Sequence, residues 1–360
     1  MINALKIVLF IWLLSNCTGI NKAKRFKPSI SKGIVKVDLK GILVDSISMY
    51  YSGCSGFYIK KGSNGVLHDP FLSNNGPLLK LNTMNLKVDT NLISEYFQQI
   101  IGSHYDSLGT IKALLASHTH YDHVLDFPYM ITNFINNDST LIGGNIGLKK
   151  LIDLENQNIL NKTKPQFKDL ASIASDSMQL KQWIYVQNRS IRILPILSEH
   201  APHYFGIKLF GGNIDSTLTK MPTKAAEFKQ GQSLAYMIDF LENEKTSFRI
   251  YIQGSASQWP AGFPPQLADG KSIDVAILCV ASFRYVTDYP EEILKRLKPS
   301  YVILSHWENF FRARNGLSQI PAEVPFTDVK TFIKRFKKTA TEIGIGGFAL
   351  PESNTTIIFK

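Results

Sequence analysis

The residues best suited to chemistry lie together in one short stretch, Ser117-His118-Thr119-His120-Tyr121-Asp122-His123. Three imidazoles and one carboxylate fall within six positions of a chain that has only eight histidines. Zinc favours imidazole nitrogen and carboxylate oxygen, and a catalytic zinc site needs a few such ligands with one position left open. His118 and His120 can point together from extended backbone, while Asp122 and His123 lie beyond the turn, where a second metal could bind. Exposed histidine-rich loops also arise by chance, but this density predicts a metal site.

The elements around the cluster are expected to place it at the end of a strand. The mostly apolar run Ile111 to Ala116 is typical of a buried strand that ends in the ligand loop. A helix should follow, with Asp126 as its cap, Pro128 in its first turn and its body over Tyr129 to Phe134. This βα rhythm recurs later in the chain, at Val275 to Val280, Glu291 to Leu297 and Tyr301 to Leu304.

The spacing His-x-His-x-Asp-His resembles that of the metallo-β-lactamase superfamily of metal-dependent hydrolases, and the resemblance extends from about Ile42 to Phe359. Further motifs follow in that family's order: a strand-end Asp in Val66 to Pro70, a histidine after Ile193 to Ser198, a glycine within Ile250 to Ser255, and a histidine after Val302 to Ser305. The resemblance implies a four-layer αβ/βα sandwich, with two sheets face to face, helices outside and metals at one sheet edge. Periodicity alone predicts only a mixed α/β chain.

The resemblance also implies roles for individual residues. His200 directly follows its strand and is preferred as a metal ligand, but His203 is an open alternative. If His203 is not a ligand, it would line the pocket as proton donor or substrate contact. Asp69 is expected to orient a ligand histidine by hydrogen bonding. One or two zinc ions are expected, with manganese or iron also compatible, and the implied ligands are His118, His120, Asp122, His123, His200 and His306.

Ser255 departs from the family pattern, because it stands where the family usually has an Asp that bridges two metals. A serine hydroxyl is neutral at pH 7 and cannot supply that negative charge. The second site would keep Asp122, His123 and His306. We therefore expect a second ion to bind more weakly than the first.

The other histidines and cysteines have plainer interpretations. His68 is expected to be structural and His104 to lie on the surface. Cys279 lies in an apolar run and should be a buried, inert thiol. Cys54 lies in a loop or at a strand edge, and a metal role for either cysteine is not expected. A disulfide between them is possible, but sequence separation says nothing about their distance.

Three further features surround the expected site. Arg284 could clamp an anionic group or be an ordinary surface arginine. Tyr204 and Phe205 could form an apolar pocket wall. The polar stretch Asn156 to Ser177 is interpreted as a helical or loop insertion over the face of the site.

The N-terminus resembles an export signal. Lys6 precedes eight apolar residues, Ile7 to Leu14, which are too few to span a bilayer but suit the apolar core of a signal peptide. Leu14 to Cys17 resembles a bacterial lipobox, whose cysteine becomes the lipidated first residue of the mature protein. The expected place is the cell envelope, anchored to the membrane by that lipid. Ordinary cleavage, giving a secreted or periplasmic protein, and an uncleaved anchor are the alternatives.

Composition and charge complete the predicted organisation. The chain has 360 residues, of which 44% are hydrophobic and 19% charged, so it can bury a core and does not have a disorder-like composition. The net charge of +11 falls to +10 without the signal, because Lys6 is its only charged residue. We expect a signal peptide over 1–16, a basic tether over 17–40 that lies against anionic membrane, and one hydrolase domain over 41–360. Nucleic-acid binding is less expected, because the basic cluster lies outside the catalytic fold.

The predicted activity is hydrolysis of a phosphodiester or lactone-type ester by a metal-activated hydroxide. Asp122 could orient that hydroxide and accept its proton. Asp69-Pro70 and the context of the third histidine resemble the lactonase and phospholipase D-like branches of the superfamily. The alternatives are β-lactam hydrolysis and a degenerate metal-binding surface lipoprotein without turnover. The substrate should be a small-molecule or lipid-like ester, and the sequence does not indicate an oligomeric state.

Overall fold

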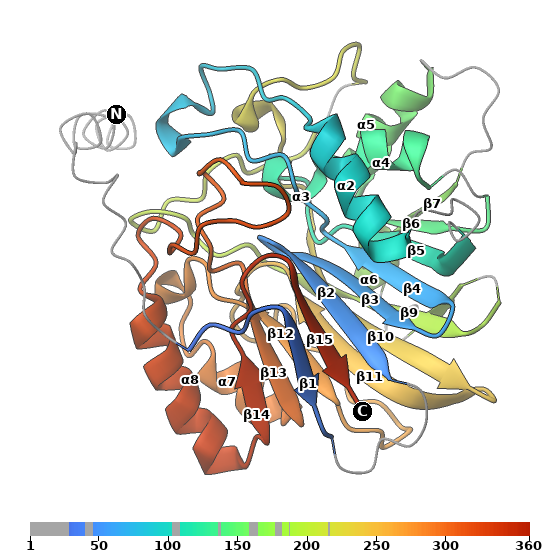
Figure 1. Ribbon diagram of the computed structural model, residues 1–360, viewed down its shortest axis with the longest axis vertical. Helices are drawn as coiled ribbons and strands as arrows, with labels where there is room; N and C mark the ends of the chain where they lie inside the picture. The colour runs from blue at the N-terminus through green and yellow to red at the C-terminus, as the bar shows by residue number, and fades with distance from the viewer. Residues whose placement is uncertain are drawn as a thin grey trace.

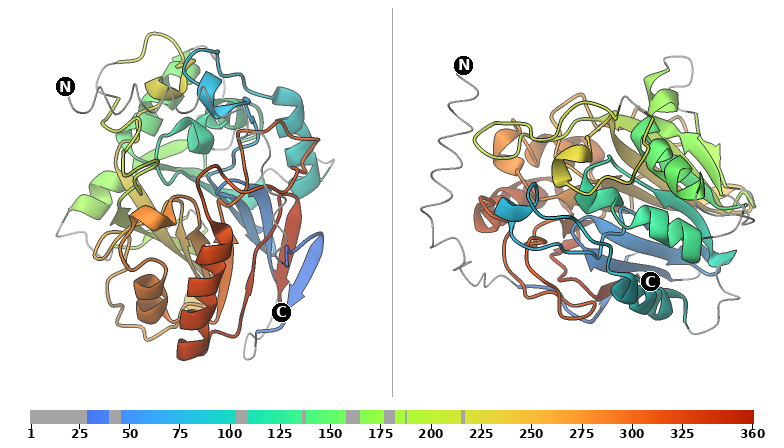
Figure 2. Two further views of the ribbon diagram at one scale, coloured as in Figure 1. Left: turned by 90° about the vertical axis from the view of Figure 1, so that its left-hand side faces the viewer. Right: turned by 90° about the horizontal axis from the view of Figure 1, so that it is seen from above.

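The computed structural model describes residues 29–39, 46–102, 109–135, 138–157, 165–176, 182–186, 188–214 and 217–360. Figure 1 and Figure 2 show two β-sheets packed face to face, with helices on their outer faces. The first sheet has the strand order β1-β15-β2-β3-β4-β5-β6-β7. Its strands are β1 (Ile34–Val37), β2 (Ile47–Gly53), β3 (Gly56–Lys61), β4 (Asn64–His68), β5 (Ile111–Leu115), β6 (Leu141–Gly144), β7 (Gln166–Asp169) and β15 (Thr355–Phe359).

The second sheet has the strand order β14-β13-β12-β11-β10-β9-β8. Its strands are β8 (Ile184–Tyr185), β9 (Ile191–Ser198), β10 (Ser233–Glu242), β11 (Lys245–Gln253), β12 (Val275–Cys279), β13 (Tyr301–Ser305) and β14 (Gly347–Ala349). The helices are α2 (Thr90–Ile101), α3 (Tyr121–Val124), α4 (Phe127–Asn133), α5 (Ile146–Gln157), α6 (Leu170–Ser175), α7 (Glu291–Leu297) and α8 (Val329–Ile343). Short 3₁₀ turns lie at η1 (Leu78–Lys80), η3 (Ala225–Glu227) and η4 (Phe283–Tyr285).

Three apolar layers hold the sheets and helices together. Along β5, Ala113 and Leu115 pack between the two sheets, whereas Leu114 packs toward α2, α4 and α5. Along β13, Ile303 packs between the sheets and Val302 packs toward α7 and α8. Because side chains alternate between the faces of a strand, both faces of these strands are buried, which explains their nearly continuous apolar sequence. The expected four-layer α/β sandwich is confirmed.

The strand directions bring the functional loops to one edge. β4 runs parallel to β5, and β2 runs the same way because β3 is antiparallel to both β2 and β4. In the second sheet β11, β12 and β13 are parallel, and β9 shares their direction because β10 is antiparallel to β9 and β11. The loops that follow β2, β4, β5, β9, β11 and β13 therefore leave from carboxyl ends of strands.

The predicted helix after the cluster forms as α4, with Asp126 at its N-cap position and a proline in its first turn. The predicted capping bond is wrong, because the Asp126 side chain does not cap the helix. Its carboxylate instead accepts hydrogen bonds from the backbone N–H groups of Leu72, at 2.7 Å, and Ser73, at 3.1 Å. It thereby ties the helix start to the loop after β4.

Two predicted boundaries also differ from the structure. The predicted tether over 17–40 extends too far, because Ile34–Val37 forms β1 and pairs in parallel with β15. The predicted insertion over Asn156 to Ser177 contains the edge strand β7 and helix α6, and none of its described residues lines the pocket over the site. The signal peptide, Cys17 and His104 lie outside the described residues.

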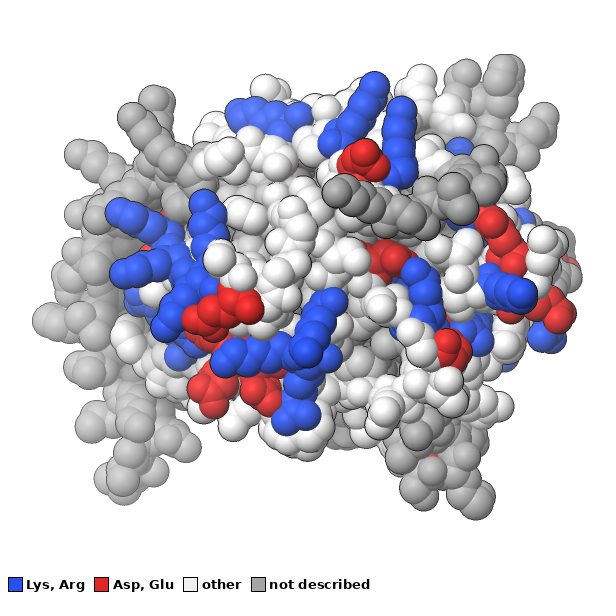
Figure 3. Space-filling view, turned by 90° about the horizontal axis from the view of Figure 1, so that it is seen from below, with Lys and Arg blue, Asp and Glu red and all other residues white. Residues whose placement is uncertain are grey.

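Charges of both signs lie side by side on the surface. Figure 3 shows the face seen from below in Figure 1, where lysine and arginine side chains lie next to aspartate and glutamate side chains.

Among the described residues, no helix is both long and apolar enough to cross a bilayer.

Candidate metal centre

The first group of candidate ligands is formed by three histidines from both sheets. His118 and His120 follow β5 and His200 follows β9, and one ring nitrogen from each lies within 4.8 Å of the other two. All three side chains are buried. The sequence prediction placed these three residues together, and the structure does so too.

The backbone and one serine orient these rings. His200 Nδ1 is 2.6 Å from the Ala201 carbonyl oxygen, to which it can only donate, so its Nε2 is left as the unprotonated nitrogen of a neutral ring. His118 Nδ1 lies 3.0 Å from the Ser117 hydroxyl, and its Nε2 lies 3.1 Å from His120 Nδ1. Metal-binding histidines commonly donate their second N–H in this way, which fixes the ring and the tautomer.

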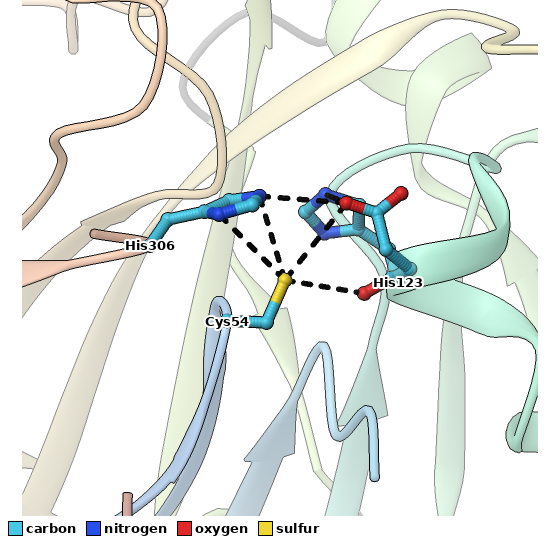
Figure 4. Close-up of side chains that lie close together, drawn as sticks. Cys54, His123 and His306 are labelled. Carbon is cyan, nitrogen blue, oxygen red and sulfur yellow. Dashed lines mark hydrogen bonds and ion pairs between the residues drawn. The ribbon is translucent and has the colours of Figure 1, made fainter. Parts of the chain in front are cut away.

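The second group contains a residue for which the sequence predicted no metal role. Asp122, His123 and His306 come together as expected, but Cys54 joins them, with one ligand atom from each of the four within 4.8 Å of the others. Figure 4 shows the Cys54 thiol pointing from the β2–β3 turn toward His306 and His123. Its Sγ is 3.5 Å from His306 Nε2 and 3.9 Å from an Asp122 carboxylate oxygen. Cys54, for which no metal role was expected, therefore lies within reach of these candidate ligands.

Asp69 orients the second group, as expected. Its carboxylate accepts hydrogen bonds from the Ser117 N–H at 2.7 Å, the Ser117 hydroxyl at 2.6 Å and His123 Nδ1 at 2.8 Å. Burial would lower the pKa of His123, but the Asp69 and Asp122 carboxylates more than offset this and raise that pKa. When the ring is neutral, Nε2 is its unprotonated nitrogen. It is buried and makes no hydrogen bond with the residues described.

The spacing of the second group fits a tetrahedral metal ion. Four ligands about 2.0–2.3 Å from one zinc ion lie roughly 3.3–3.8 Å from one another. The Asp122 carboxylate oxygen is 3.6 Å from His306 Nε2 and 3.7 Å from His123 Nε2. The Cys54 Sγ is 3.5 Å from His306 Nε2 and 3.9 Å from that carboxylate oxygen, and the other pairs lie within 4.8 Å. The buried, unpartnered nitrogen of His123 points into this group. The residues present therefore fit a divalent cation.

Burial and mutual contact favour the neutral forms of the three histidines of the first group and the ionised form of Asp122. Burial, together with neighbouring imidazoles, lowers the pKa of His118, His120 and His200, and that of His120 falls to about 3. Burial alone would raise the pKa of Asp122, but His123 and His306 more than offset it and hold that pKa well below its usual range. Neutral imidazoles beside an ionised carboxylate are the forms that bind metal.

His203 lies beside the first group. Its ring stacks on that of His200, with the ring centres 4.5 Å apart. His203 Nδ1 accepts a hydrogen bond from the Leu209 N–H at 3.0 Å, so the proton of the neutral ring is on Nε2. Burial lowers the pKa of His203 to about 4. The geometry places His200 among the candidate ligands and His203 in the pocket wall.

Ser255 lies at the end of β11, in the pocket, at the position expected from the sequence. Its hydroxyl oxygen accepts a hydrogen bond from the Ala201 N–H at 3.1 Å. The preceding residue, Gly254, has no space for a side chain, because a Cβ there would lie 2.3 Å from the Ser117 hydroxyl and 2.7 Å from the Asp69 carboxylate. Ser255 thus helps to position the loop that carries His200.

A largely apolar pocket of about 650 Å³, partly open to solvent, lies over both groups. Tyr204 lines it as predicted, but Phe205 does not and is 64% exposed. Arg284 is also absent from the described lining and pairs with Asp328 at the surface, which contradicts the anion-clamp interpretation. The apolar wall instead contains Leu78, Leu81, Tyr204, Leu209, Phe210, Phe310, Phe311 and Val324.

The remaining predictions for single residues hold where the structure describes them. His68 is buried and its Nδ1 lies 3.2 Å from the Ser55 carbonyl oxygen, so its role is structural. Cys279 is buried in β12, and burial raises its pKa to about 12. Both Cys54 and Cys279 are free thiols, so the possible disulfide is absent.

Comparisons with known proteins found similar solved structures but no similar sequence. No protein-family model and no curated protein matches the sequence. A metallo hydrolase from Ignicoccus hospitalis is similar in structure at 13% identity, with 88% of this chain and 99% of that chain covered and a TM-score of 0.48. The metallo-β-lactamase fold protein YhfI from Bacillus subtilis is similar at 13% identity, with 87% and 99% covered and a TM-score of 0.45.

A third similar structure is the diiron β-hydroxylase CmlA from Streptomyces venezuelae, at 10% identity, with 88% of this chain and 54% of that chain covered and a TM-score of 0.46. All three TM-scores lie below 0.5.

Proposed function

We propose that the protein is a metal-dependent hydrolase that cleaves a neutral ester, such as a lactone, bearing an apolar substituent. One observation carries the proposal: two groups of metal-binding side chains lie at the base of a pocket whose walls are mostly apolar. Concave, mostly apolar pockets with a few convergent polar groups are typical of small-molecule sites.

Zinc is the proposed metal, because imidazole, carboxylate and thiol groups together suit it better than manganese or magnesium. When bound, a divalent cation supplies Lewis acidity and lowers the pKa of water to about 7. The chain provides the proton-transfer and binding groups. Asp122 stays ionised and can accept a hydrogen bond from an attacking water, and His203 can donate a hydrogen bond from Nε2 to a substrate oxygen.

The pocket wall favours a neutral ester over a phosphodiester. Its apolar side chains suit a hydrocarbon chain, and no lysine or arginine appears among the described lining residues. A phosphodiester carries a charge that a protein usually binds with arginine or lysine. Arg284, the candidate from the sequence, is paired with Asp328 instead.

The test compares substrates on the zinc-loaded protein. Lactones with lengthening alkyl chains should be hydrolysed, and kcat/KM should rise by up to roughly fourfold per added methylene until the pocket is filled. Phe311→Ala in the pocket wall should flatten this chain-length series, whereas Phe263→Ala, which lines a different pocket, should not.

Three outcomes would contradict the proposal. Turnover of a phosphodiester in preference to any lactone would identify the other ester class, and turnover of a cephalosporin alone would identify a β-lactamase. A protein that binds zinc at His118 and His120 but turns over none of these substrates would be a binding protein. Where hydrolysis of any of these substrates is observed, the double variant His118→Ala with His120→Ala should lose it.

We also propose that the chain is exported and anchored to the bacterial membrane through a lipid on Cys17. The apolar run Ile7 to Leu14 followed by Leu14 to Cys17 supports this. Labelled fatty acid should be incorporated into the wild type and not into Cys17→Ala, which should leave the membrane fraction. A wild type that takes up no label would be secreted or periplasmic instead.

A further inference from the structure

Cys54 reaches the second group from a part of the chain far from the histidine motif. It lies in the tight turn between β2 and β3, at the carboxyl end of β2. Its side chain is 1% exposed, and its Sγ lies 3.5 Å from His306 Nε2 across the two sheets. The thiol therefore lies directly against the second group, next to His306 and His123 (Figure 4).

The turn holds Cys54 in an unusual backbone conformation. Its φ of 54° lies in the left-handed region, where glycine, asparagine and aspartate are the common residues of tight hairpins. The turn is fixed from both sides. The Tyr51 hydroxyl donates to the Cys54 carbonyl oxygen at 2.9 Å, and His68 holds the adjacent Ser55 carbonyl.

The same tyrosine also holds the loop that carries the last histidine. Its hydroxyl oxygen lies 3.2 Å from the backbone nitrogen of His306, and it hydrogen-bonds with the buried carboxyl group of Glu308. One hydroxyl group thus fixes the backbone of both Cys54 and His306. The two side chains are placed before any ligand arrives.

Charge gives a reason for a thiol at this position. With Ser255 neutral and bonded to Ala201, Asp122 is the only carboxylate in either candidate ligand group. We propose that Cys54 binds the second metal as a thiolate, beside Asp122, His123 and His306, and supplies the negative charge that Ser255 cannot. This inference rests on the proposed metal dependence, but not on the substrate.

The chemistry is a simple exchange of a proton for a metal bond. The Cys54 S–H bond breaks, its proton leaves to solvent, and the sulfur lone pair forms a bond to the cation. No oxidant or reductant is needed. A thiolate and a carboxylate together would match the charge of one dication. The second site would then bind its ion tightly, whereas the neutral Ser255 considered alone predicts weak binding. A thiolate also favours zinc or cobalt over manganese or magnesium.

The test uses cobalt(II) as a spectroscopic probe on the full-length protein. Titrating cobalt into apo protein should produce a ligand-field spectrum in the visible range. The ion bound by the second group, whichever equivalent fills it, should add a thiolate-to-cobalt charge-transfer band in the near ultraviolet. Cys54→Ser should abolish that band and weaken cobalt binding at the second group by at least about tenfold while leaving binding at the first group unchanged.

Cys279→Ser is the matched control, because Cys279 is the other buried thiol beside the pocket and lies outside both ligand groups. It should keep the charge-transfer band. The wild-type spectrum alone also decides the question, should a Cys54 variant fail to fold. Two equivalents of cobalt without a thiolate band would overturn the Cys54 inference and leave the proposed metal dependence intact. No cobalt binding at all would overturn both.

Discussion

Replacing Asp69 with asparagine should weaken the second metal site more than the first. Asp69 is fully buried, and one of its oxygens accepts both the Ser117 hydroxyl and His123 Nδ1–H. In Asp69→Asn the amide oxygen can still accept the Ser117 N–H, but the amide NH₂ then faces His123 Nδ1. The ring must move its proton to Nε2 to accept that bond, and Nε2 is the nitrogen that points into the second group.

The loss should be about 10–100-fold in affinity, or about 1.4–2.7 kcal/mol, the usual range for removing the partner that orients a ligand histidine. Calorimetric titration of zinc into apo protein would resolve the two sites. Asp126→Asn is the control, because Asp126 is also a buried carboxyl, accepts two backbone N–H bonds and contacts no histidine of the site. Equal weakening of both sites, or equal effects of the two variants, would refute the reasoning.

Three further outcomes are expected. Burial raises the pKa of Glu308 from 4.5 to about 8, so between these pH values the folded state keeps a proton that the unfolded state releases. The free energy of unfolding should therefore fall by about 1.4 kcal/mol per pH unit as pH rises from 5 to 7, and Glu308→Gln should flatten this slope in urea unfolding. Gly254→Ala should weaken zinc binding by roughly tenfold in the same calorimetric titration, because its Cβ would displace the Asp69 carboxylate. Arg249→Met should lower the free energy of unfolding by about 3 kcal/mol in urea, because it removes a buried bidentate partner of Asp239.

The parts of the site that local patterns predicted are those in which a strand and its ligand are adjacent in sequence. The run Ile111 to Ala116 forms β5 and delivers His118, and the apolar run before His306 forms β13. The order of apolar segment, then polar loop, is enough to place these ligands at a strand end. The four-layer sandwich was expected from the resemblance, and it forms because the strands alternate between two apolar layers.

Cys54 was missed because its place depends on sheet order and not on its neighbours. Its turn reaches the site only because β2 runs in the same direction as β4 and β5, which is a long-range relation. The available signal was a cysteine in a Gly53-Cys54-Ser55-Gly56 hairpin, where asparagine or glycine would be usual. The Asp126 cap failed for a similar reason, since the backbone N–H groups of a distant loop replaced those of its own helix.

Each candidate ligand group joins the two sheets, and this makes metal binding a form of cross-linking. The first group combines residues after β5 with one after β9, and the second places Cys54 opposite His306, 252 residues away along the chain. A metal held between such distant residues can bind the folded chain but not the unfolded one, so it stabilises the folded state by its binding free energy. Neither group exists until the sheets have docked through their shared apolar layer. The ion would therefore bind late in folding, after the two sheets have packed together. Its removal would weaken the contact between the two sheets before either sheet unfolds.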